Sequence, residues 1–213
     1  MTVEANQGTL LNPWFSMWAR PRRTMRQILD SDPERLVLVL AAIAGVSRAL
    51  DRASLKSLGD RLPLFGVLIA AIVGGALSGV LLLYLYGLCL RWTGRWFGAS
   101  GSASAVRAAI AWPNVITAWA LLLWIPEVLL FGNELFTTET PILDANPAML
   151  LLLLGFFLLE LVLAIWFVVV FLKCVGEAQG FSAWKALGNA VVGGLVMIAP
   201  FVVLGVVIAL VAF

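Results

Sequence analysis

The stretch from Met149 to Val175 constrains the fold more than any other part of the chain. It reads MLLLLLGFFLLELVLAIWFVVVFLKCV, which exceeds the roughly 20 apolar residues that a helix needs to cross a hydrocarbon core. Glu160 stands near its middle, where a carboxylate costs on the order of 2.5 kcal/mol unless it is paired, protonated or turned toward the bundle interior. The stretch therefore predicts a transmembrane helix, and the rest of the chain must surround it and accommodate this charge.

Other apolar blocks predict an all-α fold, a polytopic membrane bundle of five transmembrane helices. Of the 213 residues, 62% are hydrophobic and 12% are charged, whereas a soluble domain carries about 25% charged residues. The five-span domain is predicted at residues 33–213, with spans at about 33–52, 64–90, 108–131, 149–175 and 190–213. Within the second span, Gly75 and Gly79 form a GxxxG pattern, which permits close helix contact, either inside the chain or in a homo-oligomer.

Residues 12–32 predict an amphipathic segment that lies in the plane of the lipid headgroups. Pro21 can open a helix at its first turn, and from there Met25 and Ile28 fall on one face. The opposite face is basic, with Arg22, Arg23 and Arg26. Tryptophans just upstream favour the same headgroup level. The alternative is an ordinary basic flank before the first span, and residues 1–11 are expected to be disordered.

The basic residues predict that the N-terminus is cytosolic and the C-terminus lies outside, since five spans place the two ends on opposite sides. In this orientation the inner segments hold ten basic residues and the outer ones four, as the positive-inside rule requires. The inner set is Arg20, Arg22, Arg23, Arg26, Arg35, Arg91, Arg95, Arg107, Lys173 and Lys185, and the outer set is Arg48, Arg52, Lys56 and Arg61. The expected location is the cytoplasmic (inner) membrane of a cell.

Charged residues in and beside the spans are predicted to form a polar layer in the outer half of the bundle. The layer comprises Arg48, Asp51, Arg52, Glu127 and Glu160. At 1.5 Å per residue, Arg48 and Glu160 lie about 20 Å and about 22 Å from the inner ends of their spans. We therefore predict two ion pairs, Arg48 with Glu160 and Arg52 with Glu127. The layer has two interpretations: a structural contact that fixes the first span, or a site for a proton, an ion or a lipid headgroup.

The segment EAQGFSAWKALG between the last two spans predicts a tight cytosolic turn. Gly180 can end the preceding helix and Ser182 can cap the next one. With Glu177, Gln179 and Trp184, these residues form a candidate surface for protein partners.

The sequence lacks the residues of most catalytic sites. It contains no histidine, which removes His-activated nucleophiles and most catalytic zinc sites. There is no phosphate-binding GxxxxGK[ST] pattern, and the GASGSAS segment after the second span is interpreted as a flexible loop. Cys89 and Cys174 are interpreted as small buried apolar residues. We expect no enzymatic activity, no cofactor, no metal and no nucleic-acid partner, with the lipid bilayer as the main contact.

Five segments, in their order and spacing, resemble the prokaryotic branch of the Yip family, the Ypt/Rab-interacting-protein-type membrane domains. They are NPWFSMWARPRRTMRQILDSDP, ALDRASLKSLGDRL, CLRWTGRWFG, AWPNVITAWALLLWIPEVLLFG and EAQGFSAWKAL. The resemblance extends from Asn12 to about Gly205 and implies a five-span domain with a cytosolic N-terminus. Eukaryotic members of the family bind Rab-type GTPases, associate with each other and act in vesicle traffic. The resemblance supplies no catalytic residues.

These observations favour a non-enzymatic membrane protein of the Yip type that acts as a membrane-organising or trafficking-like scaffold. The alternative is a small transporter, channel or lipid-binding protein that uses the polar layer of arginine and glutamate side chains.

Overall fold

The computed structural model describes residues 10–212 and is helical throughout, with no strand in that range. In chain order the helices are α1 (Pro13–Ala19), α2 (Pro21–Ser31), α3 (Val37–Leu55), α4 (Leu64–Trp96), α5 (Ala103–Ala111), α6 (Asn114–Ala120), α7 (Trp124–Phe131), α8 (Pro141–Ala145), α9 (Pro147–Gln179) and α10 (Ala183–Ala212), with two short 3-10 segments, η1 (Leu58–Asp60) and η2 (Gly132–Phe136). Most of the predicted disordered segment lies outside the described residues, whereas Leu11 exchanges two hydrogen bonds of 2.9 Å with the Gln27 side chain.

Within the described residues, four helical stretches are long and apolar enough to cross a membrane: Leu64–Trp96, Ala103–Phe136, Pro147–Gln179 and Ala183–Leu210. They correspond to the predicted second to fifth spans. The predicted first span corresponds to α3, which is not among the four. The physical reason is charge, because Arg48, Asp51 and Arg52 interrupt its second half. The structure thus supports four of the five predicted spans by length and composition.

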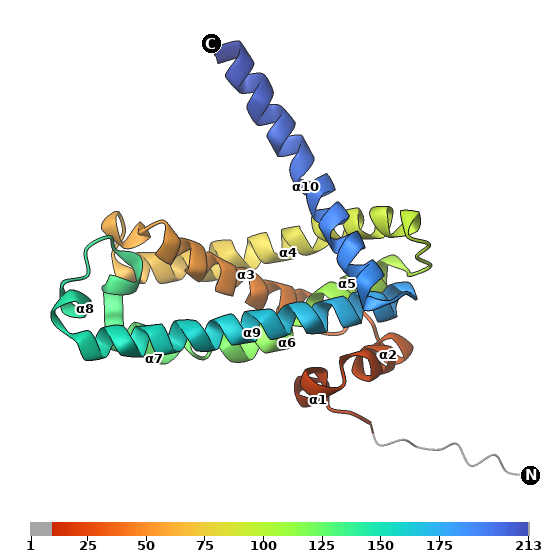
Figure 1. The fold of residues 1–213 in the computed structure, drawn as a ribbon, viewed down its shortest axis with the longest axis horizontal. Helices are drawn as coiled ribbons and strands as arrows, with labels where there is room; N and C mark the ends of the chain where they lie inside the picture. The colour runs from red at the N-terminus through yellow and green to blue at the C-terminus, as the bar shows by residue number, and fades with distance from the viewer. Residues whose placement is uncertain (1–9, 213) are drawn as a thin grey trace, which may run out of the picture.

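The bundle is elongated, and α3, α4 and α9 run along its length (Figure 1). The most extensive contact joins α3 to α4, and it depends on glycine. A Cβ added to Gly75 would lie 2.8 Å from the Gly45 carbonyl oxygen, and one added to Gly79 would lie 2.8 Å from the Gly45 Cα atom. The GxxxG pattern therefore brings two backbones together inside the chain, and α3 covers this face of α4.

The predicted third span is not one continuous helix but the succession α5, α6 and α7. Pro113 has no N–H to continue the ladder, so carbonyl groups at the end of α5 lose their usual partners. The Asn114 amide replaces them by donating to the Ile110 and Ala111 carbonyl oxygens at 2.9 and 3.0 Å. The break keeps the backbone polar groups satisfied, as an apolar surrounding requires.

Helix α10 packs against α4 and α9, and its buried residues, Ala186, Asn189 and Gly193, all lie in its first half. Its second half projects away from the bundle (Figure 1), and every residue from 198 to 210 is exposed.

Two separate groups of buried side chains form the core. The larger group lies at the end of the bundle where α2, α4, α5 and α9 meet, and includes Met17, Met25, Leu90 and Val175. The smaller group lies toward η1 and η2 at the opposite end, and includes Trp124 stacked on Phe136 with ring centroids 5.8 Å apart. Each group has its own set of polar residues nearby, and these sets are the candidate sites.

Candidate functional site

The first polar region is a buried amide cluster where α4, α9 and α10 meet. We use this name for Thr93, Gln179, Asn189 and the Leu90 carbonyl group. The Asn189 amide nitrogen donates to Gln179 Oε1 at 2.8 Å and to the Leu90 oxygen at 3.1 Å. Asn189 Oδ1 accepts from the Thr93 hydroxyl at 2.6 Å. Both amide side chains are at least 99% buried, so these hydrogen bonds replace water completely and tie three helices together.

Close packing around the amide cluster again depends on glycine. A Cβ on Gly94 would come within 2.5 Å of Gln179 Oε1, and one on Gly193 within 3.3 Å of Thr93 Oγ1. Gly180 has φ +76° and ends α9 in the left-handed conformation that suits glycine. The Ser182 hydroxyl accepts from the Lys185 N–H at 3.3 Å and caps the start of α10. The predicted turn is therefore formed, and Trp184 on it is 82% exposed.

Helix α2 is held against this same end of the bundle by ion pairs. Glu177 near the end of α9 lies 2.6 Å from Arg26 and 3.7 Å from Arg22. Met25 of α2 is fully buried. Arg23 is exposed and forms no ion pair with any described residue. The apolar side chains Met25 and Ile28 of α2 pack into the protein core and do not face lipid. The predicted position of this segment in the plane of the headgroups stays a prediction.

A further ion pair, between Arg107 of α5 and Glu34, joins the chain before α3 to the same end.

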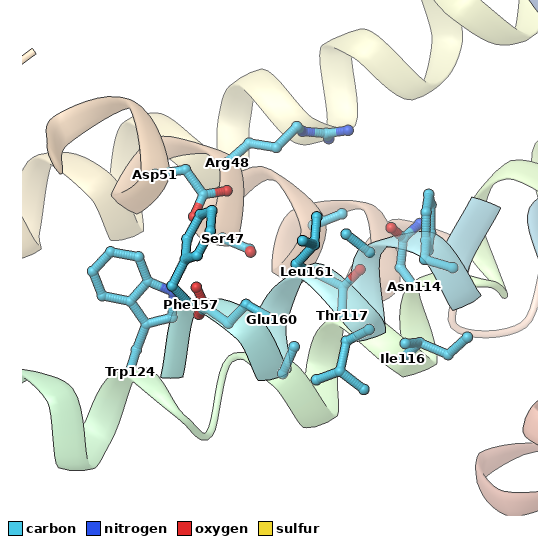
Figure 2. A pocket seen from close by; sticks show the side chains of 15 residues that line it. Ser47, Arg48, Asp51, Asn114, Ile116, Thr117, Trp124, Phe157, Glu160 and Leu161 are labelled. Carbon is cyan, nitrogen blue, oxygen red and sulfur yellow. The ribbon is translucent and has the colours of Figure 1, made fainter. Parts of the chain in front are cut away.

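The second polar region is a charged cavity of about 420 Å³ between α3, α6 and α9. We use this name for the space lined by Arg48, Asp51, Asn114, Thr117 and Glu160, among apolar residues. In Figure 2 the side chains of Asp51 and Glu160 approach it from α3 and α9, whereas the Arg48 guanidinium extends away from both toward α4. Asp51 and Glu160 also line an adjoining cavity of about 480 Å³, which Glu127 of α7 borders.

The structure corrects the predicted ion pairs. Neither Arg48 with Glu160 nor Arg52 with Glu127 is among the three ion pairs that the described residues form. Arg52 lies with Arg48 along a different cavity, between α3 and α4. The Glu127 side chain is 4% exposed, and its Oε1 atom has no hydrogen-bond partner among residues 10–212. Asp51, Glu127 and Glu160 line the two adjoining cavities. Counting residues along each helix, on which the predicted pairs were based, does not give the direction in which each arginine points.

At the far end of the bundle, loops are joined by hydrogen bonds to carboxylates. Asp60 accepts from the backbone N–H of Thr138 at 3.0 Å and from its hydroxyl at 2.6 Å. These two bonds stabilise the ionised form and hold the pKa of Asp60 below its ordinary value. Glu134 accepts from the N–H groups of Ile142 and Leu143 at the start of α8.

Of the buried polar residues that join the helices, the sequence analysis singled out Gln179 and missed three others. Thr93, Asn114 and Asn189 are all buried, and the available signal was a lone polar side chain at the edge of an apolar run. No group of three or more His, Cys, Asp or Glu side chains in the described part of the chain could hold a metal ion. The structure thus contains a hydrogen-bonded helix junction, the buried amide cluster, and a cavity lined by charged side chains, the charged cavity.

Comparison with known proteins gives one match. The family model described as the Yip1 domain matches residues 15–211. No curated protein and no solved structure matches the chain significantly.

Proposed function

The chain belongs to the Yip1 domain family, and on that premise we propose that it is a non-enzymatic scaffold that organises the membrane or partner proteins. Family membership and the four apolar helices make it a membrane protein that contacts the lipid bilayer. The molecular activity is our proposal. Its elements are a fifth span, an N-terminal interfacial helix and a cytosolic partner surface.

The path of α3 supports the fifth span. Helix α3 begins near α2, packs against α4 along its length and leads into η1 at the other end of the bundle (Figure 1). Its 19 residues correspond to about 28 Å, close to the hydrocarbon thickness of about 30 Å. Its charged half then lies near the outer headgroups, where Arg48, Asp51 and Arg52 are tolerated better than at the centre.

The docked N-terminal helices are the observation that carries the proposal. Buried Met25 and the pairs of Arg22 and Arg26 with Glu177 make α2 a fixed part of the domain. The same end holds the exposed Trp184 and most of the basic residues, which supports a cytosolic position for it. With five spans, the C-terminus is then proposed to lie outside. This end is the proposed surface for partners. Because the apolar side chains of α2 are buried in the bundle, it is the exposed Arg22, Arg23 and Arg26 that are proposed to meet the lipid headgroups. The inner membrane of a prokaryotic cell is the proposed location.

The test is reconstitution of the purified chain into liposomes, followed by cryo-electron microscopy of vesicle shape and an ion-flux assay. We expect vesicles that carry the protein to differ in curvature or clustering from protein-free vesicles. We also expect flux to stay at the protein-free level. Glu177→Arg should weaken the effect on shape, and the triple variant R22E+R26E+E177R should restore it by re-forming the ion pairs with reversed sign.

Two outcomes would contradict the proposal. Vesicles indistinguishable from protein-free ones would remove the membrane-organising role. Flux that is lost in Glu160→Gln would instead support the transporter alternative.

A further inference from the structure

A small polar cavity of about 150 Å³ lies between the end of α4 and the loop that leads to α5. Its lining includes Arg91 and Arg95 of α4, Ser100 and Gly101 of the loop, and Gln179 of α9. No acidic residue lines it. Neither arginine forms an ion pair within residues 10–212. The cavity is distinct from the charged cavity. It adjoins the buried amide cluster, because Gln179 belongs to both.

The chain builds this cavity by reversing direction at the end of α4. Gly98 has φ +83°, and the Ala99 N–H donates to the Gly94 carbonyl oxygen at 2.9 Å, as in a Schellman motif. The loop therefore folds back over the last turns of α4. Gly101 then packs so closely on α9 that an added Cβ would lie 2.5 Å from the Ala178 carbonyl oxygen. The GASGSAS segment, interpreted from the sequence as a flexible loop, is thus packed against α9 at Gly101.

The donors around the cavity suit a tetrahedral oxyanion. Arg91 and Arg95 are four residues apart, so their guanidinium groups lie on one face of α4. Arginine donors match the oxygens of a phosphate group in geometry and charge. Gln179 is 1% exposed, and its amide nitrogen makes one long hydrogen bond of 3.4 Å to the Leu90 oxygen. An amide nitrogen carries two hydrogens, so a second donor remains, and the Ser100 hydroxyl adds another.

From this arrangement we propose that the cavity binds a phosphate group through Arg91, Arg95, Ser100 and Gln179. The proposal goes beyond the scaffold function and does not depend on it. Trp92 and Trp96 flank the arginines on α4, are 52% and 61% exposed, and stack edge to face at 5.4 Å. Exposed tryptophans mark the membrane interface. The phosphate can therefore come from a lipid headgroup or from solution, and the experiment separates the two.

The experiment measures thermal unfolding of the purified full chain in detergent, with tryptophan fluorescence as the signal. Three probes are titrated: dioctanoyl phosphatidic acid, inorganic phosphate, and dioctanoyl glycerol as the lipid without phosphate. We expect phosphatidic acid to raise the Tm and dioctanoyl glycerol to leave it unchanged. In the variant R91Q+R95Q the apparent affinity should fall at least about tenfold, because two charge-assisted contacts are lost. The matched control R35Q+K185Q removes the same charge from exposed positions outside the cavity and should bind like the wild type.

The outcomes decide both the site and the source of the phosphate. A Tm rise with phosphatidic acid alone identifies a lipid headgroup, and a rise with both phosphate probes identifies the phosphate group itself. Equal affinity in R91Q+R95Q and R35Q+K185Q overturns the proposal, as does the absence of any Tm rise in the wild type. Ser100→Ala guards against misfolding of the double variant, because Ser100 is exposed. It should weaken binding about threefold through one lost hydrogen bond, and unchanged affinity in Ser100→Ala and in Arg95→Gln would likewise overturn the proposal.

Discussion

The two polar regions of this bundle differ in how their polar side chains find partners in an apolar surrounding. In the buried amide cluster, neutral side chains from α4, α9 and α10 satisfy each other with hydrogen bonds of 2.6 to 3.4 Å. In the charged cavity, Asp51 and Glu160 form no ion pair with any residue in the described range, and Arg48 points elsewhere. In the first region the buried side chains bond one another and leave one N–H of Gln179 over. In the second, the carboxylates have no ion-pair partner among the described residues.

This difference assigns separate roles to the two regions. A network of buried polar groups that bond one another rigidifies a helix junction, and breaking it leaves buried groups without partners. A charged side chain at the edge of an apolar bundle without a partner depends on water or on lipid headgroups. We therefore expect the buried amide cluster to determine stability, and we expect the charged cavity to contribute little to it. The following predictions test this contrast, from the largest expected effect to the smallest.

Asn189→Leu should have the largest effect on stability. The substitution removes three hydrogen bonds and leaves Gln179 Oε1 buried without a partner, whereas the Leu90 oxygen keeps the Gln179 amide and the Thr93 hydroxyl keeps the Cys89 oxygen. At about 1–3 kcal/mol for a buried group left unsatisfied, the free energy of unfolding should fall by roughly 3 kcal/mol. Unfolding in detergent, followed by circular dichroism, measures the change. Asn133→Leu, the same substitution at an exposed position, is the control, and equal losses in the two variants would contradict the role of the cluster.

Gly75→Ala tests the contact that holds α3, and with it one wall of the charged cavity. The added Cβ would meet the Gly45 oxygen at 2.8 Å and the Ala49 Cβ at 2.9 Å. The two helices must separate, which should cost about 2 kcal/mol. Gly74→Ala is the matched control on the same helix, because nothing lies within 4 Å of its added Cβ. That variant should be neutral or slightly more stable, and a loss equal to that of Gly75→Ala would show that close packing is not the cause.

Glu177→Arg should cost about 1 kcal/mol or less, because partly exposed ion pairs contribute little. Its larger consequence is local. Hydrogen exchange of residues 21–31 in nanodiscs should become faster when Arg22 and Arg26 are repelled from α9. The triple variant R22E+R26E+E177R should return exchange to the wild-type rate. Unchanged exchange in Glu177→Arg would mean that the apolar face alone holds α2.

Glu160→Gln should change the free energy of unfolding by less than about 1 kcal/mol, or raise it. The carboxylate has no ion-pair partner within residues 10–212, so the amide removes a charge without leaving a partner behind. Chemical unfolding in the same detergent gives the comparison with Asn189→Leu. A loss as large as that of Asn189→Leu would erase the distinction between the two regions.

The smallest effect on stability should come from the loss of the hydrogen bond between Thr138 and Asp60, at the far end of the bundle. The pKa of Asp60 is lowered in the folded state, so its contribution is present above the unfolded pKa of about 3.9 and is lost as the pH falls through the folded pKa. Thr138→Val removes the hydroxyl donor and should raise the pKa of Asp60 toward its ordinary value. NMR titration of the carboxyl carbon measures the shift, and an unchanged pKa would contradict the assigned cause.

Local signals in the sequence predicted local structure well. The run around Glu160 lies inside α9, Gly180 ends that helix, and Gly75 and Gly79 make the close contact that their spacing indicates. The charges on α3 were also visible, and they are what separate it from the four clearly apolar helices. These features depend on neighbours within a few residues, so one sequence is sufficient.

The side-chain partners could not be predicted in the same way. Depth along a helix follows from residue counting, but the rotation of Arg48 about its helix axis does not. The partners in the buried amide cluster, Thr93 and Asn189, are 96 residues apart in the chain, and they meet only because α4 and α10 pack together. The break after α5 was marked by Pro113, yet the hydrogen bonds from Asn114 that satisfy it depend on a side-chain rotamer that the sequence does not determine.

The central claim is that the two polar regions stand toward opposite sides of a five-span domain, and the topology of α3 tests it most directly. Single cysteines replace Ser31, before α3, and Lys56, after it, in a background where Cys89 and Cys174 are alanine. A membrane-impermeant maleimide is then applied to sealed vesicles of each orientation. The account predicts that Ser31→Cys is labelled only from the cytosolic side and Lys56→Cys only from the other. Labelling of both from the same side would mean that α3 does not cross the membrane and would contradict the account.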